Sequence, residues 1–354
     1  FFFSVIMRRD PKNTVMLLLV VFFVFIVFFV LFFNGGSEDD SEKYKFQQFY
    51  KKYDASSTVY NIAIVSDMDK ESKDGDHWKS SFLYGTLRRD PHSGLYSVEW
   101  GNERYIDSKL NEGGRSMELS DLCNFEDKLY SFDDRTGMVV VIEDEHAYPV
   151  ALLMDGNGRS SKGFKGEWCT VKDGKLFIGG MGKEWTDQQG NFISNDPLWV
   201  KTLETNGAVT HYDWYYQYQE IKTGAGIKSP GYILNEAVMW IPSTQNWIFL
   251  PRRVSNEKYD AVLDEYRCSN IGIYASEDFR VTKKIEDVGP LIKTRGFSSV
   301  KFVPHRENEI VVLKTDEVDG VRSYIMVYDL STGKTLLEDT LIEYDNKYEG
   351  IEFL

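Results

Sequence analysis

The sequence predicts an all-β fold, and three features of the chain indicate it. Short apolar runs, many of them rich in β-branched residues, continue from Val59 to the C-terminus, and turn-forming residues interrupt them about every 8 to 12 positions. Two of these runs flank a turn cluster at residues 90–94, which reads Asp-Pro-His-Ser-Gly. Helical periodicity is weak, and residues 214–222 are the best candidate for a short helix. The pattern is typical of a β-sandwich, barrel or propeller.

The composition is that of a large globular protein with an acidic surface. The chain has 354 residues, of which 42% are hydrophobic and 15% aromatic, so it can bury a sizeable core. Its net charge of −14 argues against a nucleic acid polymer as partner, because phosphate backbones bind basic surfaces. The charge is compatible with a metal-bridged anionic substrate and equally with ordinary solubility. Cys123, Cys169 and Cys268 form neither a disulfide framework nor a zinc pattern.

The N-terminal region is expected to anchor the protein in a membrane. Basic residues within the first twelve positions precede an apolar run at residues 15–33, which as a helix would be about 28 Å long, close to the thickness of a bilayer core. The basic flank places residues 1–14 in the cytoplasm and the rest of the chain in a lumen or outside the cell. Residues 34–57 are expected to form an acidic stalk before a domain at 58–354. Small residues follow the run, so its cleavage is left open.

A repeat organises the predicted domain. Five units each pair an oxygen-bearing residue with a following apolar strand, at intervals of about 50 to 70 residues. In the first four units a polar turn and a second apolar strand follow, and the turns lie at residues 126–127, 172–174, 243–245 and 306–308. Units of this kind predict a five-bladed β-propeller. The last strand, at 348–354, is expected to share a blade with strands near Val59, so that the ring closes.

The repeated oxygen-bearing residues are expected to meet at the propeller axis, because the innermost strand of each blade borders the central channel. They are Ser120, Glu167, Glu236, Ser298 and Glu349. Such hard oxygen donors suit Ca²⁺. The chain has only five histidines, which disfavours a zinc or iron centre. Capping of a strand end would explain any one of these positions, but not all of them in repeat register.

At these residues the sequence resembles the calcium-activated nucleotidase (apyrase) family. The matching segments include IAIVSDMD, MELSDL, LYSFDDRTG, GFKGEW, GGMGKEW, PGYILNEA and YEGIEF, and the similarity extends from about Tyr60 to Leu354. The resemblance implies a five-bladed propeller that hydrolyses nucleoside di- and triphosphates with Ca²⁺, typically favouring UDP and GDP. It also implies a setting in the endoplasmic reticulum or Golgi lumen, where some members are anchored, or outside the cell, where others are secreted.

The resemblance adds further residues to the expected site. It implies calcium ligands at the five repeat residues and also at Asp121. It supports Asp67, Asp69 and Asp134 as groups that orient a metal-bound water or act as the general base in phosphoanhydride hydrolysis. The residues alone do not choose among these three, and a plain turn aspartate is the alternative for each.

Two cations and a tryptophan complete the candidate site. Lys183, in GGMGKEW, and Arg252, in FLPRR, follow apolar strands and are candidates to contact phosphates. GGMGK is not a P-loop, because the four-residue gap and the following Ser or Thr are missing. Trp185 would ordinarily pack between blades, but the resemblance places its counterpart beside the nucleobase. The chain has no Gly-x-Ser-x-Gly elbow, which favours direct attack by water.

The sequence therefore predicts a calcium-dependent nucleoside diphosphatase that is anchored as a single-pass type II membrane protein. In a lumen with glycosyltransferases it would remove the inhibitory product UDP. One rival is a calcium-stabilised propeller that binds a protein or glycan without catalysis, and another is a calcium-dependent propeller lactonase. Cations and an aromatic residue beside the oxygen ring favour a phosphate and a base over a lactone. Nucleotide preference and homodimer formation are left open.

Overall fold

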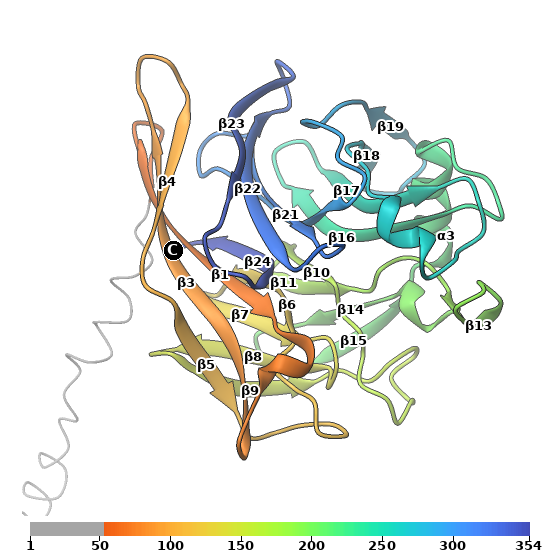
Figure 1. Cartoon of the computed structure of the whole chain (residues 1–354). Helices are drawn as coiled ribbons and strands as arrows, with labels where there is room; N and C mark the ends of the chain where they lie inside the picture. Colours follow the sequence, from red (N-terminus) through yellow and green to blue (C-terminus); the bar gives the residue numbers. More distant parts are fainter. Residues whose placement is uncertain (1–52) are drawn as a thin grey trace, which may run out of the picture. The chain divides into compact units, whose positions relative to one another are not determined.

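The computed structural model describes residues 53–354, and strands make up most of this part of the chain (Figure 1). The all-β prediction is therefore confirmed. The expected cytoplasmic end, the apolar run at 15–33 and most of the stalk lie outside the described residues. Within residues 53–354, no helix combines the length and the apolar character needed to cross a bilayer.

Three separate four-stranded antiparallel sheets follow one another along the second half of the described chain. The first contains β10 (Trp168–Lys172), β11 (Lys175–Gly179), β14 (Trp199–Leu203) and β15 (Val209–Asp213). The second contains β16 (Tyr232–Ile241), β17 (Asn246–Ser255), β18 (Gly272–Ser276) and β19 (Thr282–Ile285). The third contains β20 (Arg295–Phe302), β21 (Glu309–Asp316), β22 (Arg322–Asp329) and β23 (Lys334–Leu341).

The remaining long strands belong to a ten-stranded sheet that consists of two antiparallel groups. One group contains β24 (Lys347–Phe353), β1 (Val59–Asp67), β2 (Lys73–Asp74), β3 (His77–Arg89), β4 (Tyr96–Trp100) and β5 (Arg104–Ser108). The other contains β6 (Leu119–Phe125), β7 (Lys128–Asp133), β8 (Met138–Glu143) and β9 (His146–Leu152). One parallel pair, Asp107 with His146, joins the groups. The strands thus fall into five groups in chain order.

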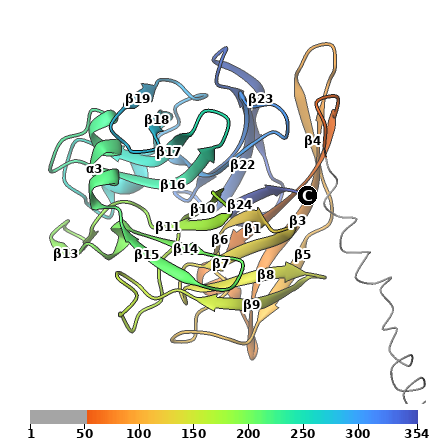
Figure 2. The same ribbon diagram turned by 180° about the vertical axis from the view of Figure 1, so that it is seen from behind.

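One strand of each group, namely β24 of the first group and the first strand of each other group, takes part in a closed ring at the centre of the described part of the chain (Figures 1 and 2). Strand β24 contacts β6, β6 contacts β10, β10 contacts β16, β16 contacts β20, and β20 contacts β24. Strand β24 also pairs with β1, from Ile62 opposite Phe353 to Asp67 opposite Lys347. The prediction that the last strand shares a sheet with the strand at Val59 is therefore confirmed, and the ends of the domain are tied together.

The hairpins predicted from the repeat are present. Each of the polar turns expected at residues 126–127, 172–174, 243–245 and 306–308 connects the first and second strands of its group. Asp127 and Gln245 have positive φ angles of 57° and 52°, which polar turn residues tolerate better than apolar ones. The short-range pattern of the sequence thus determines where these strands reverse.

The hydrophobic core is divided into layers between neighbouring groups of strands. One layer packs Tyr60 and Tyr348 against Val311, between the first and last groups. Another packs Trp168 against Trp247, between the β10 and β16 groups. Comparable clusters fill the other three junctions. Because both faces of most sheets are buried, their strands read as nearly continuous apolar runs rather than as alternating ones.

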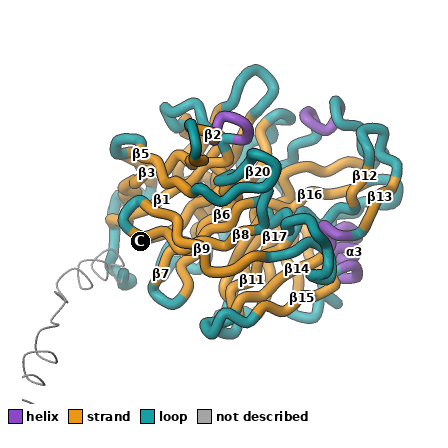
Figure 3. The backbone as a smooth tube through the Cα atoms, turned by 90° about the horizontal axis from the view of Figure 1, so that it is seen from below, coloured by secondary structure: helices purple, strands orange, loops and turns teal. Residues whose placement is uncertain are grey.

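The few helical segments lie outside the strand groups (Figure 3). The predicted short helix is present as α3 (Tyr215–Gly224), which follows β15. The short turns of 3-10 helix are η2 (Asp69–Ser72), η3 (Asp196–Leu198) and η4 (Leu263–Tyr266), and a two-stranded hairpin contains β12 (Trp185–Thr186) and β13 (Phe192–Ser194). The helix α3 packs against the outer strands β18 and β19 of the second four-stranded sheet.

Candidate functional site

Four of the five repeat residues lie at β-bulges in the central strands. Strand pairing is interrupted at residues 120–121 of β6, at Glu236 of β16, at Ser298 of β20 and at Glu349 of β24. Glu167 directly precedes β10, and its N–H donates to the carbonyl of Gly179 at 2.8 Å. A bulge turns one side chain away from the ordinary alternation of a strand. Here the bulges turn the repeat residues toward the ends of the strands instead of the core layers.

The structure brings the three repeat glutamates into one electrostatic cluster. The Arg252 Nη1 atom lies 2.6 Å from Glu236 Oε2 and 3.6 Å from Glu349 Oε1, so one guanidinium joins two of the central strands. Burial and the negative charge of Glu236 both act to raise the pKa of Glu167. The side chains of Glu167 and Glu349 are almost fully buried. These three residues thus interact electrostatically, and their joint role as calcium ligands stays a prediction.

Two lysines connect the glutamates to the predicted aspartates. Lys347 Nζ lies 2.7 Å from Glu349 Oε1 and 3.0 Å from Asp67 Oδ2. Lys165 Nζ lies 3.1 Å from Glu167 Oε1 and also contacts Asp134 Oδ2. Each of these four carboxylates is thus paired with a lysine, which offsets the cost of removing their charges from water.

Burial and neighbouring charges shift the pKa values of these carboxyl groups in different directions. Burial raises the pKa of Glu167 to about 7, although Lys165 opposes the shift. It also raises the pKa of Glu349 and of Asp134, and the nearby charge of Asp67 adds to the rise at Asp134. Burial also acts to raise the pKa of Asp67, but the charges of Lys347 and Lys165 and the hydrogen bonds from Lys347 and the Asp69 N–H together outweigh burial, so its pKa is lowered. A pair of carboxyl groups whose pKa values are pushed apart is typical of acid–base sites.

The two repeat serines lie in the same central strands. The Ser120 Oγ atom is buried and has no hydrogen-bond partner among residues 53–354. Ser298 donates its hydroxyl to the carbonyl of Tyr348 at 3.0 Å and so ties β20 to β24 next to Glu349. An unsatisfied buried hydroxyl costs free energy unless a ligand or water completes it, so Ser120 marks a place for one.

The side chain of Asp121 is directed elsewhere. Its carboxylate accepts hydrogen bonds from Ser299 Oγ at 2.8 Å, from the Cys169 N–H at 2.9 Å and from Lys301 Nζ at 3.1 Å. Burial raises its pKa against the opposing charge of Lys301. This contact joins β6, β10 and β20 and does not include the glutamates. The role of Asp121 as a metal ligand stays a prediction, and its carboxylate is fully engaged in this structure.

Asp69 is separated from the buried carboxylates. It is exposed, and its carboxylate contacts Arg115, whose Nε also donates to Glu118 at 2.7 Å. Glu118 is buried, and burial raises its pKa to about 7. Asp69 is therefore the least enclosed of the three aspartates predicted for water activation.

Lys183 and Trp185 belong to an aromatic cluster beside the carboxylates. Lys183 is buried, donates to Thr186 Oγ1 at 2.8 Å and lies 4.3 Å from the centre of the Tyr259 ring. Trp185 packs against the same cluster, and its Nε1 is buried without a partner among the described residues. Within the described part of the chain Lys183 forms no ion pair with the repeat glutamates, in contrast to Arg252, so the two predicted cations occupy different parts of the site.

Arg253 connects the aromatic cluster to the carboxylates. Its guanidinium binds Asp264 at 2.6 Å and lies 4.0 Å from Glu317, which also contacts Arg252. The aromatic cluster and the acidic cluster are therefore neighbours, joined through adjacent arginines of β17.

The donor set fits a hard divalent cation in its chemistry. The three repeat glutamates and the unpaired buried hydroxyl of Ser120 supply oxygen donors of the kind that Ca²⁺ binds. Among residues 53–354 no group of three or more Asp, Glu, His or Cys side chains lies close enough to hold a metal ion. Lysine and arginine nitrogens, from Lys165, Lys347 and Arg252, separate the carboxylates.

Sequence reasoning missed several members of this site, and a simple signal identifies them. Lys165, Lys347 and Glu118 each lie two positions before a repeat residue. In extended chain, residues two apart share one face, so each of them accompanies its repeat residue. Glu317 carries no such signal, because it follows β21 and reaches the site only through the fold.

Comparison with known proteins agrees with this geometry. Residues 66–354 match the family model described as Apyrase. The chain is 42% identical to Apyrase apy-1 of Caenorhabditis elegans, over 86% of each chain, and 42% identical to an apyrase of Cimex lectularius, over 83% of this chain and 82% of that one. It is 43% identical to Soluble calcium-activated nucleotidase 1 of Rattus norvegicus, over 83% of this chain and 74% of the relative. The chain therefore belongs to the apyrase family.

Proposed function

We propose that this protein hydrolyses nucleoside diphosphates, with UDP and GDP preferred and ADP and triphosphates also accepted, to a monophosphate and phosphate. The observation that carries the proposal is the cluster in which three cationic side chains alternate with buried carboxylates at the ends of the central strands. Charge neutralisation and positioning are the main requirements of phosphoryl transfer, and this cluster supplies both. Membership of the apyrase family supports nucleotide phosphate hydrolysis as the reaction.

We assign calcium as the cofactor. The oxygens of Ser120, Glu167, Glu236, Ser298 and Glu349 would hold it, and the unpaired Ser120 hydroxyl supports this assignment. When bound, such an ion neutralises phosphate oxygens and polarises water. The relatives named as calcium-activated nucleotidases support calcium over other divalent ions.

The acid–base role falls to Asp134 in this proposal. A general base works best with a pKa near the working pH, and burial together with the charge of Asp67 raises the pKa of Asp134. Lys347 holds Asp67 in its ionised form, which suits a group that orients water. Asp69 is exposed and serves best as a partner of Arg115.

The phosphates and the nucleobase of the substrate occupy neighbouring parts of the site in this proposal. Arg252 is almost fully buried, and a guanidinium binds phosphate oxygens in a fixed geometry. Lys183 and the half-buried ring of Trp185 flank it, joined through Arg253. Stacking of a nucleobase on such a ring is strong and tolerates different bases, which agrees with a substrate range of several nucleotides.

The wider setting remains part of the proposal. We propose that the five strand groups are the blades of a five-bladed propeller, supported by the closed ring of one strand from each group and by the core layers between them. The apolar run at residues 15–33 would anchor the protein in the endoplasmic reticulum or Golgi membrane as a type II protein, where removal of UDP supports glycosylation. Secretion after cleavage and homodimer formation are alternatives within this setting.

The test is phosphate release by the purified chain from UDP, GDP, ADP and ATP, with Ca²⁺, with Mg²⁺ or with a chelator. The proposal expects release with Ca²⁺, loss of release with the chelator, and the highest rates for UDP and GDP. Asp134→Asn should abolish release and leave thermal stability nearly unchanged, while the exposed Asp319→Asn serves as the matched control. Calcium-induced stabilisation without release from any nucleotide would support a non-catalytic binding scaffold instead.

A further inference from the structure

A separate cavity lies at the other end of two central strands. Strands β16 and β20 carry Glu236 and Ser298 in their first halves, and the turns that follow these strands border the cavity. Ile241, the last residue of β16, lines it. Five residues of extended strand separate Ile241 from Glu236, which corresponds to about 16 Å. The cavity is therefore distinct from the proposed nucleotide site.

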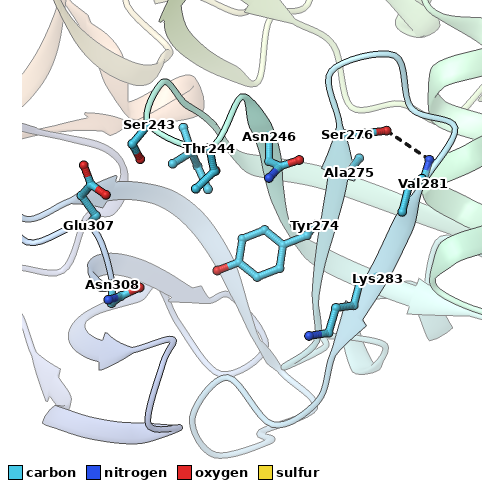
Figure 4. A pocket seen from close by; sticks show the side chains of 11 residues that line it. Ser243, Thr244, Asn246, Tyr274, Ala275, Ser276, Val281, Lys283, Glu307 and Asn308 are labelled. Carbon is cyan, nitrogen blue, oxygen red and sulfur yellow. Dashed lines mark hydrogen bonds between the residues drawn. The ribbon is translucent and has the colours of Figure 1, made fainter.

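The cavity is an open hollow between two strand groups, lined by both polar and apolar surface, with a volume of about 340 Å³. Figure 4 shows the Tyr274 ring reaching into it from β18, with Lys283 of β19 below the ring. Glu307 and Asn308, from the β20–β21 turn, face Tyr274 across the open space. Ser243, Thr244 and Asn246, from the β16–β17 hairpin, line the upper rim. The lining thus comes from both groups.

Most polar side chains around this space have no hydrogen-bond or ion-pair partner within the described part of the chain. Within residues 53–354, the side chains of seven lining residues make no hydrogen bond or ion pair. They are Ser243, Thr244, Asn246, Tyr274, Lys283, Glu307 and Asn308. Hydroxyls and amides can both donate and accept, so this lining offers many hydrogen bonds to one ligand. By contrast Ser276, also at the cavity, is bonded to Asp278 and to the Val281 N–H.

The charges at the cavity balance. Lys283 supplies one positive charge and Glu307 one negative charge on opposite sides of the space. A phosphate or nucleotide would meet the carboxylate as well as the amine, and a cation would meet the amine as well as the carboxylate. The lining therefore favours a neutral ligand that carries many hydroxyl groups.

Apolar surface is also present where such a ligand would lie. The Tyr274 ring is partly buried, and burial raises the pKa of its hydroxyl, so it presents a neutral phenol with one face toward the space. Val281 is 68% exposed at the rim. Sugar rings combine a polar edge with an apolar C–H face, which matches an aromatic ring surrounded by amides and hydroxyls. The cavity volume lies near the low end of the ~300–1,000 Å³ range of ligand pockets, which suits a small ring.

We propose that this cavity binds a neutral pyranose sugar, either free or as the terminal unit of a glycan. The proposal does not depend on nucleotide hydrolysis, because the cavity shares no residue with the proposed catalytic cluster. The protein would then have two binding sites: the nucleotide site at the acidic cluster and a carbohydrate site on the opposite face.

The test is saturation-transfer NMR of the purified full-length chain with four probes. The probes are the methyl pyranosides of mannose, galactose, glucose and N-acetylglucosamine, because shallow polar pockets bind such small ligands in about the millimolar range. At least one probe should bind, and Thr244→Arg should weaken its binding at least about tenfold by filling the rim. Thr205→Arg, the same change on an exposed threonine of the β14–β15 turn, should leave binding unchanged.

Two further measurements separate this proposal from the nucleotide site. Both arginine variants should hydrolyse nucleotides at the wild-type rate, which also shows that they are folded, and Asn308→Ala should weaken sugar binding without altering hydrolysis. Binding of a glycoprotein that is lost after removal of its glycans would identify a terminal sugar as the source. Displacement of the probe by excess UDP, equal binding by Thr244→Arg, or no binding of any probe at about 10 mM would overturn the proposal.

Discussion

Replacing Lys301 with methionine removes one half of a buried ion pair that joins two central strands, β20 and β6. The Lys301 and Asp121 side chains are 3% and 2% exposed, and the amine lies 3.1 Å from both carboxylate oxygens. Methionine has a similar length and no charge, so the change isolates the charge. Asp121 would keep its hydrogen bonds from Ser299 and from the Cys169 N–H.

The expected cost is large because the carboxylate remains buried without its cation. Removal of one partner of a buried pair destabilises proteins by about 3–5 kcal/mol. Asp121→Asn should cost a similar amount, because it leaves the lysine buried and uncompensated. The double variant should be less destabilised than the sum of the two single changes by about 2 kcal/mol or more, because no buried charge then remains.

Urea denaturation of the purified chain, with a chelator and with Ca²⁺, measures these quantities. The structure directs the Asp121 carboxylate away from the glutamates, so Asp121→Asn should keep the stabilisation that Ca²⁺ confers, while Glu236→Gln should lose it. Additive costs in the double variant would refute the ion-pair reasoning. Loss of the calcium effect in Asp121→Asn alone would show instead that Asp121 is a metal ligand, as the family resemblance implies.

Three other predictions concern particular contacts. Burial lowers the pKa of Lys201 to about 8 from the ordinary value of 10.5, so the folded state binds this proton less tightly than the unfolded state does. The contribution of Lys201 to the free energy of unfolding should therefore rise between pH 8 and 10.5. Lys201→Met should remove that rise in thermal melts recorded at a series of pH values. A Cβ added at Gly350 would lie 2.6 Å from the Asp121 carbonyl carbon, so Gly350→Ala should destabilise the fold by about 1–3 kcal/mol in urea denaturation. Gly101→Ala should cost less, because the nearest atom to its Cβ would be the Tyr84 carbonyl oxygen at 3.3 Å. Trp185→Ala should raise KM for UDP more than it lowers kcat, and an equal fall of kcat and kcat/KM would argue against base binding by this ring.

Local patterns in the sequence were sufficient to predict the four hairpins of the repeat. Short apolar runs and polar turns identified the hairpins, including the turn at residues 243–245, because a two-strand reversal depends on neighbouring residues. The pairing of β24 with β1 was also predictable, because a repeat architecture must close to leave no exposed edge.

The side-chain arrangement of the site was less predictable. The repeat register identified Glu167, Glu236 and Glu349 as neighbours, but the bulges that aim the repeat residues depend on how adjacent strands pair. Asp121 follows a repeat residue directly, yet its carboxylate binds Lys301 of a strand far along the chain. Such choices are set by tertiary packing and not by local sequence.

The basic residues of the site were also poorly predicted from the sequence. Lys183 was expected beside the phosphates because it follows an apolar strand, but it lies with the aromatic cluster. Lys165 and Lys347 were overlooked although they repeat at the same spacing before glutamates. A buried carboxylate needs a compensating charge, so a search for basic residues two positions from each repeat glutamate would have found both.

The central claim is that residues on separate central strands form one cation site that holds a pyrophosphate. Diffraction from crystals of the chain grown with Ca²⁺ and a non-hydrolysable UDP analogue tests it most directly. The account predicts one calcium ion among Glu167, Glu236 and Glu349, in contact with the analogue's phosphates and beside Arg252. A calcium ion and analogue bound elsewhere, with these glutamates still paired to lysine and arginine, would contradict it.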